Sequence, residues 1–298
     1  MAWKIDSKTA AEKLPQRSEN GNKGSFGRLY MIGGSFGMSG AVILAARAAL
    51  SCGIGLLRVA TPQRAATVLA SAVPECTYFP LPGTPTGQIG FGDMQTAITD
   101  MQNSDAVLFG CGVGLTRDTC RASYELLQCG SLPTVIDADG LNAVAKNIDV
   151  LSQHKSPVII TPHLKEMERL SEIPVAEIQK NAEAIATDFA KKYNVVTVLK
   201  DSTTVIATPE GKAYIHARPN SGLAKGGSGD VLAGIIAAFL AQGLSCENAA
   251  VLGVYVHGAA GAYATKKYTA YCTQPSLMIQ QLPSVFTDLL AAHKAAEE

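Results

Sequence analysis

Short apolar segments alternate with longer segments of helical periodicity from about residue 28 to residue 260. The short segments have the length and near-continuous hydrophobicity of strands that are buried on both faces of a sheet. The predicted strands are 28–32, 56–60, 106–110, 134–137, 158–161 and 195–200. The predicted helices are 40–51, 64–71, 93–101, 117–129, 176–193, 230–242, 246–267 and 275–294. This alternation predicts an α/β fold with a mainly parallel central sheet.

Two further apolar segments, 203–207 and 213–216, flank a short segment that contains Pro209 and Gly211. Proline and glycine favour a tight turn, so we expect an antiparallel hairpin at one side of the sheet. The stretch 77–92 is rich in proline and glycine and predicts a long surface loop. No shift in composition marks a domain boundary. We therefore expect a single domain over residues 1–298, with residues 1–24 as an N-terminal extension.

The composition is that of a compact protein with few surface charges, as in oligomers, with 47% hydrophobic and 17% charged residues among 298. Basic and acidic residues number 25 each, which argues against binding of nucleic acid or an anionic membrane. No apolar run approaches the roughly 20 residues of a membrane span. The 7 cysteines lack the spacing of a zinc site and fit reduced thiols in a cytoplasmic protein.

The strongest local signal is a glycine loop directly before the apolar helix-forming run 231–241. The loop consists of Gly226, Gly227, Ser228, Gly229 and Asp230. Closely spaced glycines let backbone N–H groups converge on an anion, and the helix N-terminus adds partial positive charge. This pattern predicts a phosphate site, in which Asp230 accepts the proton of a substrate hydroxyl. The alternative is a tight turn with Asp230 as a helix cap. The GxxxxGK[ST] pattern is absent.

Two other glycine clusters follow predicted strands. The first runs from Gly33 to Ala41, and its adjacent glycines break the GxGxxG spacing of a dinucleotide-binding loop. The second runs from Gly110 to Gly114 and is explained equally well by a strand-to-helix turn. Neither cluster identifies a ligand by itself.

Polar side chains also stand at the carboxyl ends of predicted strands, where ligands bind in α/β sheets. Asp137 and Asp139 can organise Mg²⁺ through water or contact a sugar hydroxyl, and helix capping explains them equally well. His163 and Glu166 share one helical turn and can hold substrate or metal-bound water, although a solvated first turn would look similar. Lys200 can face a nucleotide phosphate or be a solvated strand end. The remaining histidines and the cysteines are interpreted as structural or surface residues.

Taken together, these segments resemble the ribokinase-like superfamily and, within it, the ADP- or ATP-dependent NAD(P)H-hydrate dehydratases, the family of the YjeF C-terminal domain. The resemblance covers about residues 25–295. Its motifs are 33–35 with 39–41 and 44–46, 110–114, 137–139 with 141–142, 161–163 with 166–167, 198–200 and 223–234. It implies a three-layer α/β/α sandwich with a mainly parallel central sheet and an antiparallel edge hairpin.

The resemblance implies repair of NADHX and NADPHX, the hydrated forms of the nicotinamide cofactors. ADP, or ATP in eukaryotic members, would phosphorylate the hydrate hydroxyl, and elimination of phosphate would restore NADH or NADPH. Phosphate is a far better leaving group than water, which explains why a dehydratase would have a kinase fold. The expected co-substrate here is ADP, with Mg²⁺ between the nucleotide phosphates and water.

The resemblance also implies the roles of individual residues, with Asp230 as the catalytic base. The expected substrate-binding residues are Ala41, Gly112, Gly114, His163 and Asp230. The expected nucleotide-binding residues are Lys200, Asp201, Ser202, Thr203, Thr204, Gly226, Gly227, Ser228 and Gly229. The N–H groups of the glycine loop would stabilise charge on the transferring phosphoryl group. No side chain is expected to bind the metal directly, although Asp139 and Glu166 are candidates.

Four residues depart from the usual pattern of this family, which has glycine at Lys165 and Asp201, proline at Cys111 and threonine at Lys225. The choice between ADP and ATP and between NADHX and NADPHX stays open. Family members are commonly tetramers, so we expect a homotetramer. The epimerase domain often fused to this family is expected to be a separate protein. The alternatives are a small-molecule kinase, acting on hydroxyethylthiazole or a sugar, and a non-catalytic nucleotide-binding regulator.

Overall fold

A mixed ten-stranded sheet forms the centre of the computed structural model, in the order β1-β10-β9-β8-β7-β6-β5-β2-β3-β4. The structure describes residues 2–297, with side chains up to residue 294. The strands are β1 Trp3–Lys4, β2 Arg28–Ile32, β3 Leu56–Pro62, β4 Thr77–Leu81, β5 Ala106–Phe109, β6 Thr134–Ile136, β7 Val158–Ile160, β8 Val196–Leu199, β9 Thr203–Ala207 and β10 Ala213–Ala217. The pairs from β4 through β8 are parallel, and β9 pairs antiparallel with both β8 and β10.

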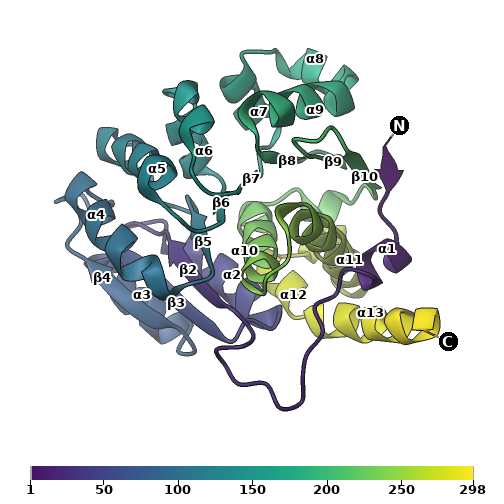
Figure 1. Ribbon diagram of the computed structural model, residues 1–298. Helices are drawn as coiled ribbons and strands as arrows, with labels where there is room; N and C mark the ends of the chain where they lie inside the picture. The colour runs from purple at the N-terminus through teal and green to yellow at the C-terminus, as the bar shows by residue number, and fades with distance from the viewer. Residues whose placement is uncertain (1, 298) are drawn as a thin grey trace.

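Helices cover both faces of this sheet, as Figure 1 shows. They are α1 Ser7–Ala11, α2 Ser39–Ser51, α3 Gln63–Ala72, α4 Phe91–Asp100, α5 Arg117–Cys129, α6 Asp139–Val144, α7 Leu164–Ser171, α8 Val175–Lys180, α9 Ala182–Tyr193, α10 Ser228–Ala241, α11 Cys246–Cys272, α12 Pro275–Ile279 and α13 Leu282–Glu297. The three-layer sandwich, the mainly parallel sheet and the hairpin at one side are confirmed, with β1 as the outermost strand beyond the hairpin.

The strand residues alternate between two apolar cores, one on each face of the sheet. In β2, Leu29 and Met31 belong to the core that includes α2, α10 and α11, while Tyr30 and Ile32 belong to the core under α4, α5 and α9. This division follows from the alternation of side chains along a strand. Because both faces are buried, the central strands read as continuous apolar runs in the sequence.

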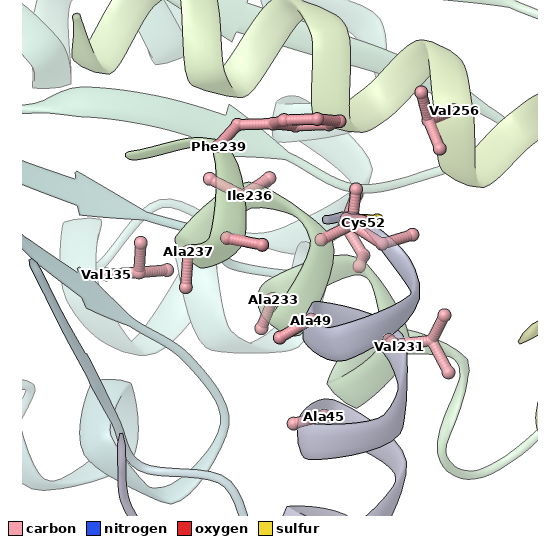
Figure 2. Close-up of a cluster of buried hydrophobic side chains, with 14 of the residues drawn as sticks. Ala45, Ala49, Cys52, Val135, Val231, Ala233, Ile236, Ala237, Phe239 and Val256 are labelled. Carbon is pink, nitrogen blue, oxygen red and sulfur yellow. The ribbon is translucent and has the colours of Figure 1, made fainter. Parts of the chain in front are cut away.

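Small residues let α2 and α10 pack closely beneath the sheet. Ala49 of α2 lies against Ala233 of α10 in Figure 2. A Cβ atom on Gly234 would lie 2.2 Å from the carbonyl oxygen of Ala45, so only glycine fits there. This contact matters for the site, because it holds the N-terminal end of α10 against the sheet.

Three predictions of secondary structure were wrong. Part of the stretch 77–92 is β4, which pairs in parallel with β3; its Pro80 is tolerated because β4 is an edge strand. The predicted helix 176–193 is two helices that meet at Asn181, whose backbone is not helical, and nothing in the sequence marks this break. The predicted helix 275–294 breaks before Leu282, because Pro283 lacks the N–H that a continuous helix needs there.

The short elements β1, α1 and α6 were not predicted, and of α7 only the first turn, with His163 and Glu166, was expected. Within the described residues, no helix is long and apolar enough to cross a membrane. All 7 cysteines are free thiols, which is consistent with the expectation of reduced cysteines.

Candidate active site

A cavity of about 780 Å³ opens where β6, β7 and β8 end and α10 begins. Its lining combines the glycine loop, the polar residues at the strand ends and part of β10 and α11. The lining residues are Asp137, Ala138, His163, Glu166, Lys200, Asp201, Ser202, Thr204, His216, Arg218, Pro219, Asn220, Ser221, Leu223, Ala224, Lys225, Gly226, Gly227, Ser228, Gly229, Asp230, Leu232, Val254, His257 and Gly258. The structure thus brings most of the predicted nucleotide-binding residues together with His163 and Asp230.

The glycine loop forms the N-terminal end of α10, as the sequence predicted. Gly227 has a φ of 94° and precedes the first helical residue, Ser228. A side chain at Gly227 would also collide with Leu44, since its Cβ atom would lie 2.6 Å from Leu44 Cδ1. At Gly229 a Cβ atom would face Lys200 Nζ and Asp137 Oδ2 at 3.4 and 3.8 Å. The first turn of a helix has N–H groups without intrahelical acceptors, so this loop can bind an anion.

Asp230 lies in the first turn of α10 and is partly buried. Burial raises the pKa of its carboxyl group to about 6, and the neighbouring Asp137 raises it further, while Cys111 and Lys200 oppose the shift. A carboxylate whose pKa lies near neutrality is suited to accept a proton from a substrate hydroxyl. The alternative that Asp230 serves only as a helix cap is not supported, because the N-cap residue of α10 is Gly227 and no side chain caps this helix.

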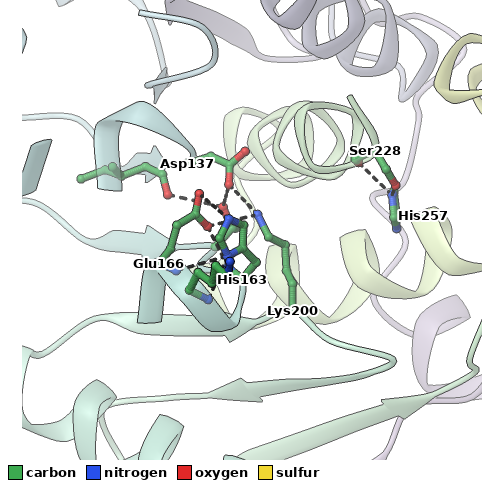
Figure 3. A network of polar contacts seen from close by, with 9 residues as sticks. Asp137, His163, Glu166, Lys200, Ser228 and His257 are labelled. Carbon is green, nitrogen blue, oxygen red and sulfur yellow. Dashed lines mark hydrogen bonds and ion pairs between the residues drawn. The ribbon is translucent and has the colours of Figure 1, made fainter. Parts of the chain in front are cut away.

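Asp137 and Lys200 form an ion pair, as Figure 3 shows, and both influence the pKa of Asp230. Lys200 Nζ lies 2.7 Å from Asp137 Oδ1, which also accepts a hydrogen bond of 2.6 Å from the Thr161 hydroxyl. Lys200 Nζ lies 4.0 Å from Glu166 as well. Although burial lowers the pKa of Lys200, Asp137 and Glu166 raise it overall, so the ammonium group stays charged. This places a fixed positive charge at the cavity wall, next to the glycine loop.

His163 and Glu166 cap α7 reciprocally, and both line the cavity. His163 Nδ1 accepts hydrogen bonds from the N–H groups of Lys165 and Glu166, so the ring proton is on Nε2, 3.4 Å from Glu166 Oε1. Burial lowers the pKa of His163, with a further contribution from Lys200, which keeps the ring neutral. Burial raises the pKa of Glu166 to about 7. Capping and a cavity role therefore coexist in the same two side chains.

The remaining predicted substrate residues form a second group beside the cavity. Gly112 lies against Ala41, because a Cβ atom on Gly112 would come within 3.0 Å of Ala41 Cβ. Gly114 donates its N–H to Asp139 Oδ2 at 2.9 Å. Ala41, Gly112 and Gly114 do not line the cavity itself. The turn that holds them reaches it through Cys111, whose sulfur atom lies within 4.8 Å of a carboxylate oxygen of Asp230.

The two candidate metal-binding carboxylates have different environments. Asp139 is occupied by the N–H of Gly114 and does not line the cavity. Glu166 and Asp137, for both of which the sequence analysis considered a role near the metal, are buried in the cavity wall. Oxygen donors of this kind suit Mg²⁺. Glu166 and Asp137 therefore have carboxylates in the cavity wall that suit a magnesium ion, whereas the carboxylate of Asp139 lies outside this lining.

Two histidines of the cavity wall were missed by sequence reasoning. His257 of α11 contacts Ser228 in the glycine loop, with Nε2 at 3.0 Å from the backbone oxygen and 3.2 Å from the hydroxyl oxygen. His216 of β10 is also buried in the cavity wall and lies against Gly258 of α11. Burial lowers the pKa of each ring to about 4, so both are neutral. No local sequence signal could have found them, because Ser228 and His257 are far apart in the chain.

Only some of the predicted nucleotide-binding residues from Lys200 to Thr204 line the cavity. Lys200, Asp201, Ser202 and Thr204 line the cavity, and Asp201 and Ser202 are exposed at its mouth. Thr203 belongs to β9 and does not line it. In β9, Thr203 and Thr204 point to opposite faces of the sheet, so only one of them can face the cavity.

Known proteins resemble this chain over most of its length. It is 39% identical over 277 residues to the bifunctional NAD(P)H-hydrate repair enzyme Nnr of Moorella thermoacetica, which covers 93% of this chain but 52% of that protein. The chain thus spans about half the length of this bifunctional relative. It is 35% identical to the ADP-dependent (S)-NAD(P)H-hydrate dehydratase of Neisseria meningitidis, over 82% of this chain and 79% of that one.

The fold and the family agree with these sequence relatives. The crystal structure of the ADP/ATP-dependent NAD(P)H-hydrate dehydratase from Bacillus subtilis, co-crystallized with ATP/Mg²⁺, superposes with a TM-score of 0.84. It is 27% identical and covers 97% of this chain and 99% of that one. The sequence model of a family described as NAD(P)H-hydrate dehydratase matches residues 29–284. This chain therefore belongs to the NAD(P)H-hydrate dehydratase family.

Proposed function

We propose that the protein dehydrates NADHX and NADPHX to NADH and NADPH at the expense of ADP, releasing AMP and phosphate. The observation that carries this proposal is the position of Asp230. Its carboxylate stands in the first turn of α10, between the glycine loop and the turn of Cys111 that leads to Gly112 and Gly114. A base in this position can serve a hydroxyl on one side and a phosphate chain on the other.

The chemistry follows from that position in two steps. Asp230 accepts the proton of the hydrate hydroxyl, whose oxygen forms a bond to the β-phosphorus of ADP while the bond to the AMP oxygen breaks. The carbon–oxygen bond of the resulting phosphate ester then breaks, phosphate leaves with the bonding electrons, and loss of a proton restores the nicotinamide double bond. The N–H groups of Gly226, Gly227, Ser228 and Gly229 stabilise the charge on the transferring phosphoryl group.

Other cavity residues would orient the two substrates. Lys200 offers a permanent positive charge to the nucleotide phosphates, and Asp201, Ser202 and Thr204 line the path toward its ribose. Neutral His163 can donate or accept a hydrogen bond at the hydrate, near Ala41, Gly112 and Gly114. Glu166 and Asp137 would hold Mg²⁺, which shields the negative charge of the phosphates when it is bound.

We also propose the setting in which this reaction occurs. Residues 1–298 form one dehydratase domain with a short N-terminal extension, which corresponds to about half of the bifunctional relatives. The functional unit is a cytoplasmic homotetramer, which light scattering of the purified protein would test.

The decisive experiment incubates the protein with NADHX, Mg²⁺ and either ADP, ATP or no nucleotide. We expect nucleotide-dependent recovery of the NADH absorbance band, with one phosphate released for each NADH formed. The same assay with NADPHX decides the preferred hydrate. Absence of any nucleotide-dependent recovery of NADH absorbance would contradict the proposal. A kinase of the same superfamily would instead leave phosphate on its product, and a non-catalytic regulator would bind nucleotide without turnover.

A further inference from the structure

Three side chains that can bind a metal ion meet at the inner end of the cavity. The sulfur of Cys111 and one carboxylate oxygen each of Asp137 and Asp230 lie within 4.8 Å of one another. They come from three different elements: the turn after β5, the end of β6 and the first turn of α10. Because all three elements are anchored in the two cores, this grouping does not depend on the conformation of a surface loop.

One of the carboxylates has an oxygen without a protein partner. Asp137 is only 1% exposed, and both hydrogen bonds to its carboxylate, from Lys200 and Thr161, end on Oδ1. Among the described residues, no hydrogen bond ends on Oδ2, which faces the Cα side of Gly229. Asp137 lines the cavity, so a cation or a hydrogen-bond donor of a ligand can reach this oxygen from there.

The negative charge of this group is also not fully balanced by positive charge. Lys200 supplies one positive charge to Asp137, and Asp230 adds a second carboxylate in the same place. Burial and the neighbouring carboxylates of Asp230 and Asp137 raise the pKa of the Cys111 thiol well above its usual value, so the thiol keeps its proton until a metal ion displaces it. Once the proton is displaced, the group carries three negative charges and one positive charge. A divalent cation would then balance the group, because its two charges equal the remaining difference. Metal binding commonly drives such a loss of a thiol proton.

The mixture of donors selects the kind of metal. Mg²⁺ and Ca²⁺ prefer oxygen ligands only, whereas a thiolate with two carboxylates suits a softer ion. Zinc binds sulfur at about 2.3 Å and carboxylate oxygen at about 2.0–2.2 Å. Two ligands at such distances from one ion lie at most about 4.5 Å apart. The three donor atoms here lie within 4.8 Å of one another, so small side-chain shifts would bring them onto one ion. Asp137 and Asp230 line the cavity, which gives an ion access to them.

We propose that Cys111, Asp137 and Asp230 form an inhibitory site for a thiophilic divalent cation of the zinc or cadmium type. The ion bonds to the Cys111 sulfur and to one oxygen of each carboxylate, and the thiol proton passes to solvent. Occupation removes the lone pair with which Asp230 accepts a proton. The inhibition rests on the proposed function, whereas the binding of the ion does not.

The test is a titration of the protein with Cd²⁺ in the presence of excess Mg²⁺, followed by calorimetry and by the ultraviolet charge-transfer band of the cadmium–thiolate bond. We expect the unmodified protein to bind one Cd²⁺ ion per chain tightly. Cys111→Ser keeps the size of the side chain but removes the sulfur. This variant should lose the charge-transfer band and bind the Cd²⁺ ion at least ~100-fold more weakly. Asp230→Asn should weaken this binding while the band persists. Cys272→Ser, at an exposed thiol, is the matched control and should leave it unchanged.

Each outcome decides a separate part of the proposal. Equal Cd²⁺ binding by the unmodified protein and a folded Cys111→Ser variant, or loss of the tight equivalent in Cys272→Ser, would overturn the site. If Cys111→Ser does not fold, Asp230→Asn decides, and unchanged affinity there overturns the site as well. A tight equivalent without loss of ADP-dependent turnover would overturn the inhibitory role. Lack of turnover before any Cd²⁺ is added would contradict the proposed function, while the binding data still decide the site.

Discussion

Two partly or fully buried charge clusters flank the parallel sheet, and their chemistry differs. At the cavity, Asp137, Glu166 and Asp230 surround the single ammonium group of Lys200. At the opposite ends of β2 and β3, Arg58 binds Asp100 through two hydrogen bonds of 2.6 and 2.8 Å, and the Tyr30 hydroxyl donates a third at 2.9 Å. The first cluster has excess negative charge, whereas the second is balanced.

The pKa shifts follow this difference. Burial raises the pKa of Glu166 to about 7 and that of Asp230 to about 6, because the cavity has too few donors for its carboxylates. Burial also acts on Asp100, but the hydrogen bonds from Arg58 and Tyr30 outweigh it and lower its pKa. A saturated ion pair stabilises one protonation state, whereas an unsaturated cluster is ready to exchange a proton or bind a ligand. The comparison therefore separates a structural ion pair from a functional site.

The largest effect should come from Asp230→Asn, which removes the base from the unsaturated cluster. We expect kcat to fall about 10²- to 10⁴-fold, while the dissociation constant of ADP changes little, because only proton transfer is lost. Steady-state kinetics with NADHX and calorimetry with ADP measure the two quantities. A variant that retains most of its kcat would contradict the assignment of Asp230 as base.

Lys200→Met should destabilise the fold most strongly among changes in this cluster. It leaves the buried carboxylate of Asp137 without its counter-ion, so we expect the free energy of unfolding to fall by about 3–5 kcal/mol. Denaturant unfolding at pH 8 measures this loss. The double variant with Asp137→Asn is the control and should recover much of the stability, because no buried charge remains. A loss below about 1 kcal/mol in the single variant would show that water already neutralises the pair.

The two clusters should respond to acid at different pH values. As pH falls through about 6, Asp230 becomes protonated, and kcat/KM should drop about tenfold for each further pH unit. Cys111, Asp137, Asp139 and Lys200 are the charged or titratable groups that influence Asp230, and their influence is contained in this value. A raised carboxyl pKa means that the folded state takes up this proton more readily than the unfolded state. Protonation of Asp230 therefore does not itself destabilise the fold between pH 6 and pH 4.

The pKa of Asp100 shifts in the opposite direction. Its pKa is lowered on folding, so its contribution to stability is present above the unfolded pKa of about 3.9 and is lost as pH falls below that value. A pH series that combines kinetics with circular dichroism should show activity lost near pH 6 while the fold persists. Parallel loss of activity and structure would remove the distinction between the two clusters.

The smallest effect should come from Asp100→Asn, which breaks the balanced pair. Arg58 is partly exposed, so we expect a loss of only about 1 kcal/mol in the free energy of unfolding. The values of kcat and KM should not change, because this pair lies away from the cavity. Thermal unfolding and the NADHX assay measure both. A change in kcat larger than about threefold would mean that the two clusters are coupled through the sheet.

Much of the fold was predictable because the central strands are buried on both faces. Runs such as Arg28–Ile32 and the helix-forming segment after Gly229 have periodicities that few other structures satisfy. The failures lie where tertiary contacts overrule local preference. Pro80 resembles a loop residue in the sequence, yet it stands in an edge strand because β3 offers a partner.

The site was predictable to the extent that it is built from one continuous segment. The glycine loop and Asp230 were singled out from their spacing, because closely spaced glycines directly before a helix favour anion binding and Asp230 follows them immediately. The contacts of His257 with Ser228, and of Cys111 with Asp230, join residues far apart in the chain. No pattern in the sequence reports such pairs.

The sequence by itself therefore determined the central strands, most of the long helices and the glycine loop with its carboxylate, because each depends on neighbours along the chain. Only the tertiary structure decided which acids share one cavity and which are satisfied elsewhere. Asp137 and Asp139 are two residues apart, but one faces the cavity with Lys200 and the other binds the N–H of Gly114. The physical reason is that charge, burial and pKa depend on distance in space, and the packing of α10 against the sheet sets that distance.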